Sequence, residues 1–491
     1  MNDRLRNLLL AATLSASAMS LAACETNTAT GRSIFTMGST IEDDQKIGAQ
    51  EHPKIIKEYG GVYDDPNVTS YIAVIGARMA GASELPQIPW HFTVLNSEEL
   101  NAFALPGGYV YITRGLLALA DNEAEVAGVL AHEIGHVTAR HTAERQGDAT
   151  LAGLGTMVAS VLLGQTGGQL ANTLGSGAIQ HYSQSQETEA DTLGVRYLAR
   201  TGYQIGAMAD FLTKMRDYSR LQNKIAGRPE DAVDKEDFFA SHPRTIDRVQ
   251  DATAAAARTT GSGTALNRET YLQTINGLTF GDDASQGFVR GRQFIHPQLM
   301  FRFEVPEGFR LINRPDSVLG LGPNGAMMLF NMDTKRQGGT AVDYMRRTLG
   351  RQANLQNIER IEVNGMDGAT ATARGRTNSG TVDVRFIAIK QGDERVYQFT
   401  FATPPNLTQQ LNEALRRTTY SLRSISAQEA AQIKPWRIQV QRVKAGETVS
   451  TFVGRMAMPD NKEDWFRTLN GLAPGEQLQA GQMVKIVAQN R

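Results

Sequence analysis

The stretch that decides the fold of the first half of the chain is Leu130-Ala131-His132-Glu133-Ile134-Gly135-His136. On an α-helix, residues four apart lie on the same face, so His132 and His136 would offer two imidazoles to one metal ion. Glu133 would lie beside that ion. A helix is predicted because an Asp-Asn pair can cap its start, acids follow in its first turn, and apolar residues recur at helical intervals.

The spacing H-E-x-x-H on a helix is typical of zinc peptidases, in which both histidines bind the metal and the glutamate acts as general base. Two ordinary histidines would give the same letters, so a third ligand has to decide between the two interpretations. A catalytic zinc takes three protein ligands and keeps one position for water. The best cluster downstream is Glu187-Thr188-Glu189-Ala190-Asp191, on a helix predicted over residues 182–203.

Composition places the chain among globular proteins of several domains. Its 491 residues exceed what one core can hold, and about 150 residues per domain predicts roughly three. Lys and Arg number 50 against 51 Asp and Glu, so there is no overall basic field and no nucleic-acid partner is expected. Cys24 is the only cysteine, which excludes an internal disulfide and a cysteine ligand in the body of the chain.

The amino terminus predicts an export signal over residues 1–23. Two arginines precede an apolar run over residues 8–19, which is too short to span a membrane. The following Leu21-Ala22-Ala23-Cys24 resembles the lipobox of bacterial lipoproteins. This implies acylation of Cys24, a lipid anchor in the membrane and, with Glu25 next in the chain, the outer membrane. The alternative is a plain secretory signal that ends in a chance cysteine. Small polar residues over 24–39 predict a tether.

The predicted elements divide the rest of the chain into three regions. Residues 40–258 begin with helices over 41–59 and 67–79, a strand over 90–95, and two short β segments around the turn Pro106-Gly107-Gly108. Residues 151–179 of this region are nearly uncharged and interrupted by glycines. A mobile helical flap near the site is favoured there over a segment that touches a membrane.

The second region follows a predicted linker over 259–284. Residues 285–427 alternate β-rich pieces with helices over 341–349 and 407–420, which predicts an α+β domain with a mainly antiparallel sheet. The third region, 436–491, begins with a strand. The fold class is therefore α+β and multidomain.

Residues 30–258 resemble the M48 peptidases, a gluzincin family that includes membrane-embedded CAAX-processing proteases and periplasmic BepA-like proteases. The resemblance rests on the H-E-x-x-H motif, the Glu-x-Glu-Ala-Asp run, Asn101-Ala102-Phe103 ahead of the Pro-Gly-Gly turn, and Ser241-His242-Pro243 with Arg248. It implies a mainly helical peptidase domain with a small edge-strand sheet. It also implies one Zn²⁺ per chain.

The resemblance assigns roles to individual residues. His132, His136 and Glu189 are expected to bind the metal, and Asp191 is expected to orient a ligand histidine. Glu133 would be the general base. The resemblance also implies that Asn101, Ala102 and Phe103 form the edge strand that binds substrate. His242 and Arg248 would stabilise the oxyanion or orient substrate, or His242 would instead occupy the zinc and hold the enzyme shut. His141 and His181 are interpreted as structural.

The two later regions carry weaker resemblances. The tail, with Gly446-Glu447-Thr448, Leu469-Asn470 and a closing Leu-x-x-Gly-x-x-Val-x-Ile, resembles a LysM module, a small βααβ fold that binds N-acetylglucosamine polymers such as peptidoglycan. It departs from that pattern in a long insert over 456–464. Residues 303–309 faintly resemble PsbP-like domains, whose function here is unreadable from the sequence.

Together these features predict a zinc endopeptidase of the bacterial envelope, anchored in the outer membrane and facing the periplasm. Its substrates would be extended or unfolded polypeptides, taken from misfolded or unassembled envelope proteins. Peptidoglycan and the outer-membrane assembly machinery are further expected partners. The alternative is an assembly chaperone or peptidoglycan-tethered binding protein with a closed, little-used zinc site. Glu133 favours the peptidase, because a protein that only binds needs no general base.

Overall fold

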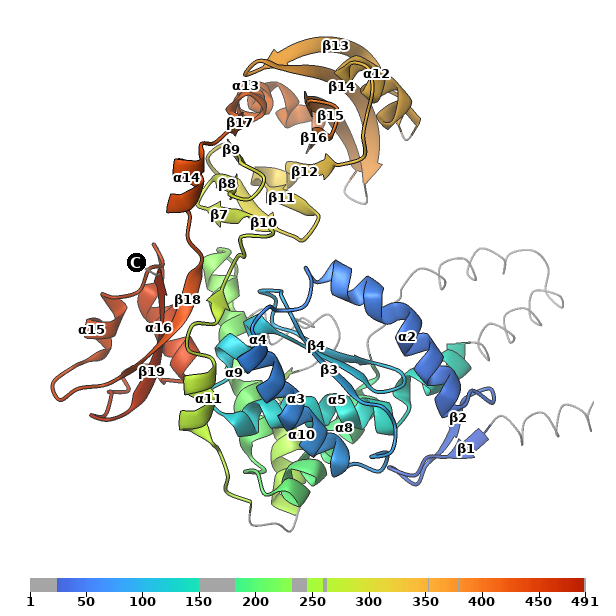
Figure 1. Cartoon of the computed structure of the whole chain (residues 1–491), viewed down its shortest axis with the longest axis vertical. Helices are drawn as coiled ribbons and strands as arrows, with labels where there is room; N and C mark the ends of the chain where they lie inside the picture. The colour runs from blue at the N-terminus through green and yellow to red at the C-terminus, as the bar shows by residue number, and fades with distance from the viewer. Residues whose placement is uncertain are drawn as a thin grey trace, which may run out of the picture. The chain divides into compact units, whose positions relative to one another are not determined.

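The structure is a computed structural model that describes residues 24–149, 182–231, 245–258, 263–351, 353–377 and 380–489. They fold into two compact units (Figure 1). The first unit holds residues 61–278 together with the preceding residues up to Ile56 and with Arg437–Ala488, and the second is built on Thr279–Trp436. Helices and several antiparallel sheets are present, so the predicted mixed, multidomain class is confirmed.

The first unit is organised around helix α5 (Glu123–Thr138), which carries the H-E-x-x-H motif. Its side chains are buried on nearly every side, as expected of a helix inside a core. Asn122 caps it, because its side chain accepts a hydrogen bond of 2.9 Å from the Glu125 amide. The helices around it in this unit are α2 (Ile41–Glu58), α3 (Pro66–Gly81), α4 (Arg114–Leu119), α8 (Gln184–Thr201), α9 (Ala207–Ile225), α10 (Thr245–Arg258) and α11 (Arg268–Thr274).

A glycine lets α5 and α8 approach closely. A Cβ placed on Gly135 would lie 3.0 Å from the Ala190 carbonyl oxygen and 3.2 Å from the Ala190 Cα. Larger side chains at this position would push the two backbones apart. The glycine inside the motif therefore brings the acidic run of α8 within reach of the two histidines.

A small sheet lies beside the motif helix, with the strand order β3 (His91–Leu95), β5 (Tyr109–Thr113) and β4 (Ala102–Leu105). β4 and β5 are antiparallel and joined by the Pro-Gly-Gly turn, where Gly107 and Gly108 have φ of 82° and 95°. The predicted hairpin is confirmed. β4 lies at the edge of this sheet.

The predicted tether is folded. β1 (Cys24–Thr26) and β2 (Ser33–Phe35) form an antiparallel hairpin, and Ile34 is buried. Asn27 closes the turn through its side-chain oxygen and donates from Nδ2 to the Thr138 carbonyl, 2.8 Å away, at the end of α5. The small polar residues that predicted a flexible segment instead form a tight turn docked on the motif helix. Residues 1–23 and the side chain of Cys24 lie outside the described residues.

The tail has the predicted β-α-α-β order, with β18 (Trp436–Arg442), α15 (Val449–Val453), α16 (Lys462–Asn470) and β19 (Met483–Gln489). It does not form a separate unit, because residues 437–488 belong to the first unit. Lys485 is fully buried and donates from Nζ to the carbonyls of Ala118, Leu119 and Ala120 at the end of α4. The predicted linker is folded as well, since Tyr271 of α11 is buried and donates to the Leu117 carbonyl at 2.6 Å.

The second unit contains a seven-stranded antiparallel sheet. The strand order is β10 (Arg310–Asn313), β11 (Ser317–Leu321), β12 (Met327–Asp333), β16 (Arg395–Thr403), β15 (Gly380–Gln391), β14 (Met366–Thr377) and β13 (Gln356–Val363). A second sheet has the order β17 (Arg423–Ser424), β9 (Phe301–Glu304), β8 (Gln293–His296) and β7 (Phe288–Arg290). The second unit also contains the short strand β6 (Thr279–Phe280) and the helix α14 (Ala427–Gln432).

Two helices cover opposite faces of the seven-stranded sheet. α13 (Pro405–Ser421) packs through Leu415 on the face that bears Ile387, Phe399 and Phe401. α12 (Ala341–Arg347) packs on the face that bears small residues such as Ala369 and Ala388. The antiparallel sheet and both helices of this region agree with the sequence-based prediction.

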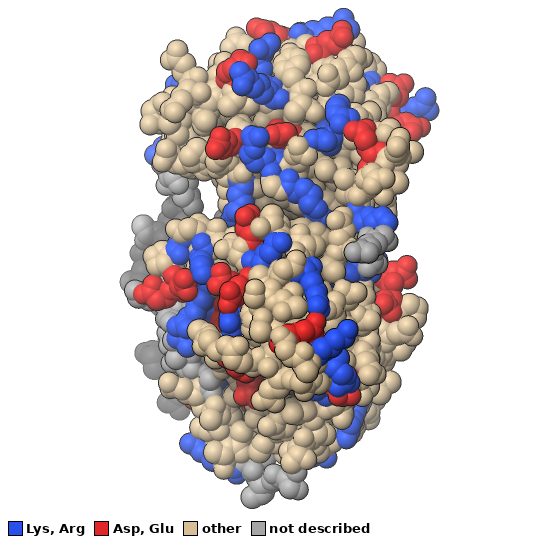
Figure 2. Space-filling view, turned by 90° about the vertical axis from the view of Figure 1, so that its left-hand side faces the viewer, with Lys and Arg blue, Asp and Glu red and all other residues tan. Residues whose placement is uncertain are grey.

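No helix within the described ranges combines the length and apolarity needed to cross a bilayer. The predicted flap over 151–179 lies outside those ranges. On the face seen in Figure 2, basic and acidic side chains are interspersed, as the balanced composition predicts.

Candidate metal centre

Three buried side chains from two helices bring ligand atoms together. The Nε2 atoms of His132 and His136, on α5, lie 3.0 Å apart. Glu187, on α8, places Oε2 3.5 Å from His132 Nε2 and Oε1 3.5 Å from His136 Nε2. Ligand atoms around a tetrahedral zinc are separated by roughly 3.3 Å, since each lies about 2.0–2.1 Å from the metal. The cluster therefore fits a divalent metal ion with two nitrogen ligands and one oxygen ligand.

The structure brings Glu187 into this cluster as the candidate third ligand, whereas the sequence-based prediction was Glu189. Glu189 points away and lies 3.1 Å from His141 Nε2 and 2.7 Å from Arg32 Nη1. The reason is helical geometry, since residues two apart on a helix lie on different faces. Asp191, four residues after Glu187, shares its face and is the better guide to the ligand.

Asp191 orients the first histidine, the role expected of it. Its Oδ1 lies 2.7 Å from His132 Nδ1, so the other ring nitrogen is directed at the cluster. Burial alone would raise the pKa of Asp191, but the charge of Arg248 and the contact with His132 hold it well below the usual range of an aspartate. Asp191 is therefore a carboxylate in the folded protein.

Arg248 is engaged with carboxylates. It contacts both oxygens of Asp191, at 2.8 and 3.1 Å, and one oxygen of Glu187 at 3.2 Å. Burial would lower the pKa of Arg248, yet the charges of Asp191 and Glu187 raise it above its ordinary value. These contacts support a role for Arg248 in positioning Asp191 and Glu187, beside the predicted roles of stabilising the oxyanion or orienting substrate.

His141, predicted to be structural, contacts the second ligand histidine. The Nδ1 atoms of His141 and His136 are 2.8 Å apart, and Glu189 lies at the other side of the His141 ring. Arg32, from the amino-terminal hairpin, completes this line with contacts to Glu189 and, at 2.6 Å, to Glu144. His141 therefore orients the second ligand histidine, as Asp191 orients the first. The signal for this role in the sequence is the position of His141, five residues after His136 and just past the end of α5.

Glu133 lies beside the ligand atoms, in the wall of a small cavity of about 50 Å³. Its side chain is buried. Apart from Glu133, His132, Arg248 and Asn101, the residues that line the cavity are apolar or glycine: Leu100, Ala102, Leu116, Gly128, Val129, Met208, Phe211, Leu212 and Met215. A carboxylate in these surroundings can exchange a proton with a water molecule at the metal.

The predicted substrate strand borders the same cavity. Asn101 and Ala102 line it, and Phe103 follows on β4. The Asn101 carbonyl accepts from the Thr113 amide at 3.0 Å, so Asn101 is paired with β5. Because backbone groups alternate in direction along an antiparallel strand, the amides and carbonyls of Ala102 and Ala104 point away from β5. Within the described ranges no further strand pairs with β4, so its outer side offers a backbone edge next to Glu133. His242 and His181 lie outside the described residues.

Comparison with solved structures finds only remote likenesses. The cyanobacterial PsbP from Synechocystis sp. PCC 6803 is 12% identical, with a TM-score of 0.23, and covers 29% of this chain and 98% of that one. A likeness at this level carries no argument. The PsbP-like and LysM-like resemblances therefore stay predictions.

The comparisons are specific for the first unit. Residues 66–256 match the family model for Peptidase family M48. The Beta-barrel assembly-enhancing protease of Yersinia pestis is 34% identical over 248 residues, which is 48% of each chain. Mitochondrial metalloendopeptidase OMA1 of Schizosaccharomyces pombe is 26% identical over 214 residues, 43% of this chain and 60% of that one. The chain spans about half the length of the bacterial relatives that it matches. Residues 66–256 of this chain are therefore a metallopeptidase domain of family M48.

Proposed function

We propose that this protein is a zinc endopeptidase of the bacterial envelope that cleaves extended segments of misfolded or unassembled proteins. One observation carries the proposal: the buried Glu133 lies next to three convergent ligand atoms and lines a small cavity that is bordered by a strand edge. A site that only bound metal would need neither the general base nor the edge.

The roles of the side chains follow from their positions. Zinc held by His132, His136 and Glu187 would polarise the scissile carbonyl and lower the pKa of a bound water towards neutrality. Glu133 takes the proton of the attacking water and passes it to the leaving amine. Asp191 and His141 hold the two ligand histidines in orientation.

The substrate binds as an added strand. The outward amides and carbonyls of Ala102 and Ala104 pair with an extended segment, which selects unfolded chains over folded ones. The cavity beside Glu133 takes a side chain of that segment. Because its walls include Leu116, Met208 and Phe211, an aliphatic side chain is favoured next to the cleaved bond.

The experiment uses casein and an unfolded outer-membrane protein as substrates for the full chain. Wild type, Glu133→Gln and His242→Ala are compared with and without added zinc. We expect zinc-dependent cleavage that Glu133→Gln abolishes while zinc stays bound. If neither wild type nor His242→Ala cleaves either substrate, the peptidase proposal fails. Cleavage by His242→Ala alone would assign a self-inhibiting role to His242.

The envelope location rests on the lipobox-like residues and on the relatives' name, which refers to β-barrel assembly. We propose that Cys24 is acylated and anchors the enzyme in the outer membrane, facing the periplasm. The assembly machinery for outer-membrane proteins is then a plausible source of substrates. Labelling with a fatty-acid analogue tests the anchor, since a Cys24→Ser variant must lose the label.

The carboxy-terminal β-α-α-β element supports a second proposal, that this part binds peptidoglycan. Cosedimentation of the full-length Glu133→Gln variant with purified sacculi tests it. We expect the variant to sediment with the sacculi. Soluble N-acetylglucosamine oligomers should release it into the supernatant. Recovery in the supernatant at all protein concentrations would exclude a glycan-binding role.

A further inference from the structure

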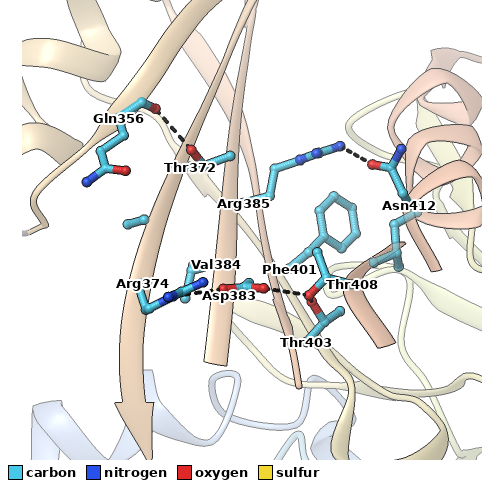
Figure 3. A pocket seen from close by; sticks show the side chains of 12 residues that line it. Gln356, Thr372, Arg374, Asp383, Val384, Arg385, Phe401, Thr403, Thr408 and Asn412 are labelled. Atoms are coloured by element: carbon cyan, nitrogen blue, oxygen red, sulfur yellow. Dashed lines mark hydrogen bonds and ion pairs between the residues drawn. The ribbon is translucent and has the colours of Figure 1, made fainter. Parts of the chain in front are cut away.

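The second unit contains a cavity of about 470 Å³ between the seven-stranded sheet and helix α13 (Figure 3). We propose that this cavity binds an organic carboxylate with an apolar body. The proposal rests on residues of the second unit alone, so it is independent of the peptidase activity.

The first argument is a break in the pattern of strand β15. Every second residue of this strand points towards α13, and Ile389 and Ile387 are buried there in the core. The next two positions on the same face are Arg385 and Asp383. Both side chains are only partly buried. The apolar face beneath α13 therefore ends here in two charged side chains that border the cavity.

One of the two charges is paired at the rim of the cavity, where the Arg374 side chain is 73% exposed and that of Asp383 is 26% exposed. Asp383 accepts from Arg374 at 3.2 Å and from the Thr408 hydroxyl at 2.9 Å, and Thr408 in turn lies 2.8 Å from the Thr403 hydroxyl. Figure 3 shows this line of side chains running from β14 to α13. Asp383 and Arg374 therefore satisfy each other.

Arg385 is different. It donates to the neutral side-chain oxygen of Asn412 on α13, at 2.8 Å, and contacts no carboxylate in the part of the chain that the structure describes. A guanidinium carries five N–H donors in a planar fork that matches a carboxylate. With two arginines and one aspartate in its lining, the cavity has an excess of one positive charge.

The surroundings of Arg385 define the rest of the ligand. Phe401 is its direct neighbour across the β15–β16 pair and is 2% exposed, and Leu415 of α13 lies opposite the sheet. In Figure 3 the Phe401 ring lies between the Arg385–Asn412 pair and the line through Asp383. An apolar group can rest on Phe401 while its carboxylate reaches Arg385.

Two sources could supply such a ligand: a free organic acid or the carboxy-terminal residue of a polypeptide. Hydrocinnamate serves as probe for the first and N-acetylphenylalanine for the second. The neutral amide of each probe is the matched ligand control. Binding is measured by calorimetry on the full-length Glu133→Gln variant, in which hydrolysis does not interfere.

We expect saturable binding of at least one acid, and binding of its amide at least about tenfold weaker, as charge-assisted hydrogen bonds predict. The substitution Arg385→Gln should weaken the acid about tenfold, whereas Arg385→Lys should retain part of the affinity. Arg346→Gln, which changes an exposed arginine of α12 on the opposite side of the sheet, is the matched control and should change nothing. The acid that binds more tightly shows whether the ligand is a free organic acid or the carboxy-terminal residue of a polypeptide.

Three results would overturn the proposal. They are equal affinity for acid and amide, unchanged affinity in a folded Arg385→Gln variant, or no saturable binding of either acid. Thermal unfolding followed by circular dichroism shows whether the variants are folded. If Arg385→Gln unfolds, the comparison of acid with amide on the wild-type cavity decides alone.

Discussion

Lys485 Nζ lies 3.0 Å from Asp121 Oδ1, and Asp121 immediately precedes the residue that caps the metal-binding helix. The same aspartate contacts Lys214 of α9 at 2.7 Å. A buried ammonium from the tail of the chain is thus joined to the start of α5. Burial is the first cause that lowers the pKa of Lys485, to about 8, although Asp121 acts against it.

The first prediction concerns this lysine. Lys485→Met removes the partner of three carbonyls and of Asp121, and we expect a loss of about 3–5 kcal/mol in the free energy of unfolding. Chemical denaturation of the full chain measures it. The exposed Lys444, in the turn after β18, offers a control, because Lys444→Met should cost less than about 1 kcal/mol. Equal losses in both variants would contradict the proposed role of Lys485.

The second prediction separates the two glutamates of α8. Glu187→Gln removes a metal ligand and should lower zinc affinity at least about 100-fold, because two histidines alone hold zinc weakly. Glu189→Gln acts only through His141 and should cost about tenfold. Competition with a fluorescent chelator measures both affinities. If Glu189→Gln lowered zinc affinity more than Glu187→Gln, Glu189 would be the metal ligand and the assignment of Glu187 would be wrong.

The third prediction concerns His141. His141→Ala leaves His136 without its orienting partner and should weaken zinc binding about 10- to 100-fold. His91→Ala is the control, since His91 stacks on Tyr109 on the small sheet and is not among the metal-centre residues. Zinc affinity unchanged by His141→Ala would reduce this residue to an ordinary core histidine.

The fourth prediction is a pH dependence in the second unit. His296 is buried, and its Nδ1 accepts from the Leu299 amide at 3.3 Å, so the neutral ring fits the site. Burial, aided by Arg395, lowers its pKa to about 4. Between pH 4 and about 6.5 the unfolded chain binds the extra proton and the folded chain does not. Stability therefore falls as the pH drops through this window, by up to about 3 kcal/mol.

Hydrogen exchange of strands β8 and β9 at pH 7 and pH 4.5 measures this loss. A His296→Gln variant should show a smaller loss of stability between the two pH values. The imidazole that titrates is gone, while the carboxylates of the protein titrate as before. An identical change in both proteins would assign the acid sensitivity to other groups.

The metal helix and the edge strand could be predicted because their signals are local. The four-residue spacing of His132 and His136 and the turn at Gly107 and Gly108 each fix a conformation without reference to distant residues. The prediction of Glu189 as the third metal ligand followed the resemblance of residues 187–191 to the Glu-x-Glu-Ala-Asp run. The rule that residues four apart share a helix face, applied to Asp191, would have selected Glu187.

Long-range contacts account for the remaining differences. Neither the docking of Asn27 on the end of α5 nor the insertion of Lys485 beside Asp121 leaves a local signature. The composition of residues 24–39 resembles that of a linker, and a lysine in a strand is ordinarily exposed. Only the tertiary fold provides the partners that bury both residues.

The motif helix is held at one end by the hairpin of residues 24–35 and at the other by Lys485, which follows Ala118 by 367 positions. During synthesis the histidines therefore emerge long before the strand that secures their helix. Loop closure over such a distance is slow compared with local helix formation. The start of the motif helix therefore gains this buried partner only after β19 has been made, so a segment far along the chain completes the surroundings of the metal centre.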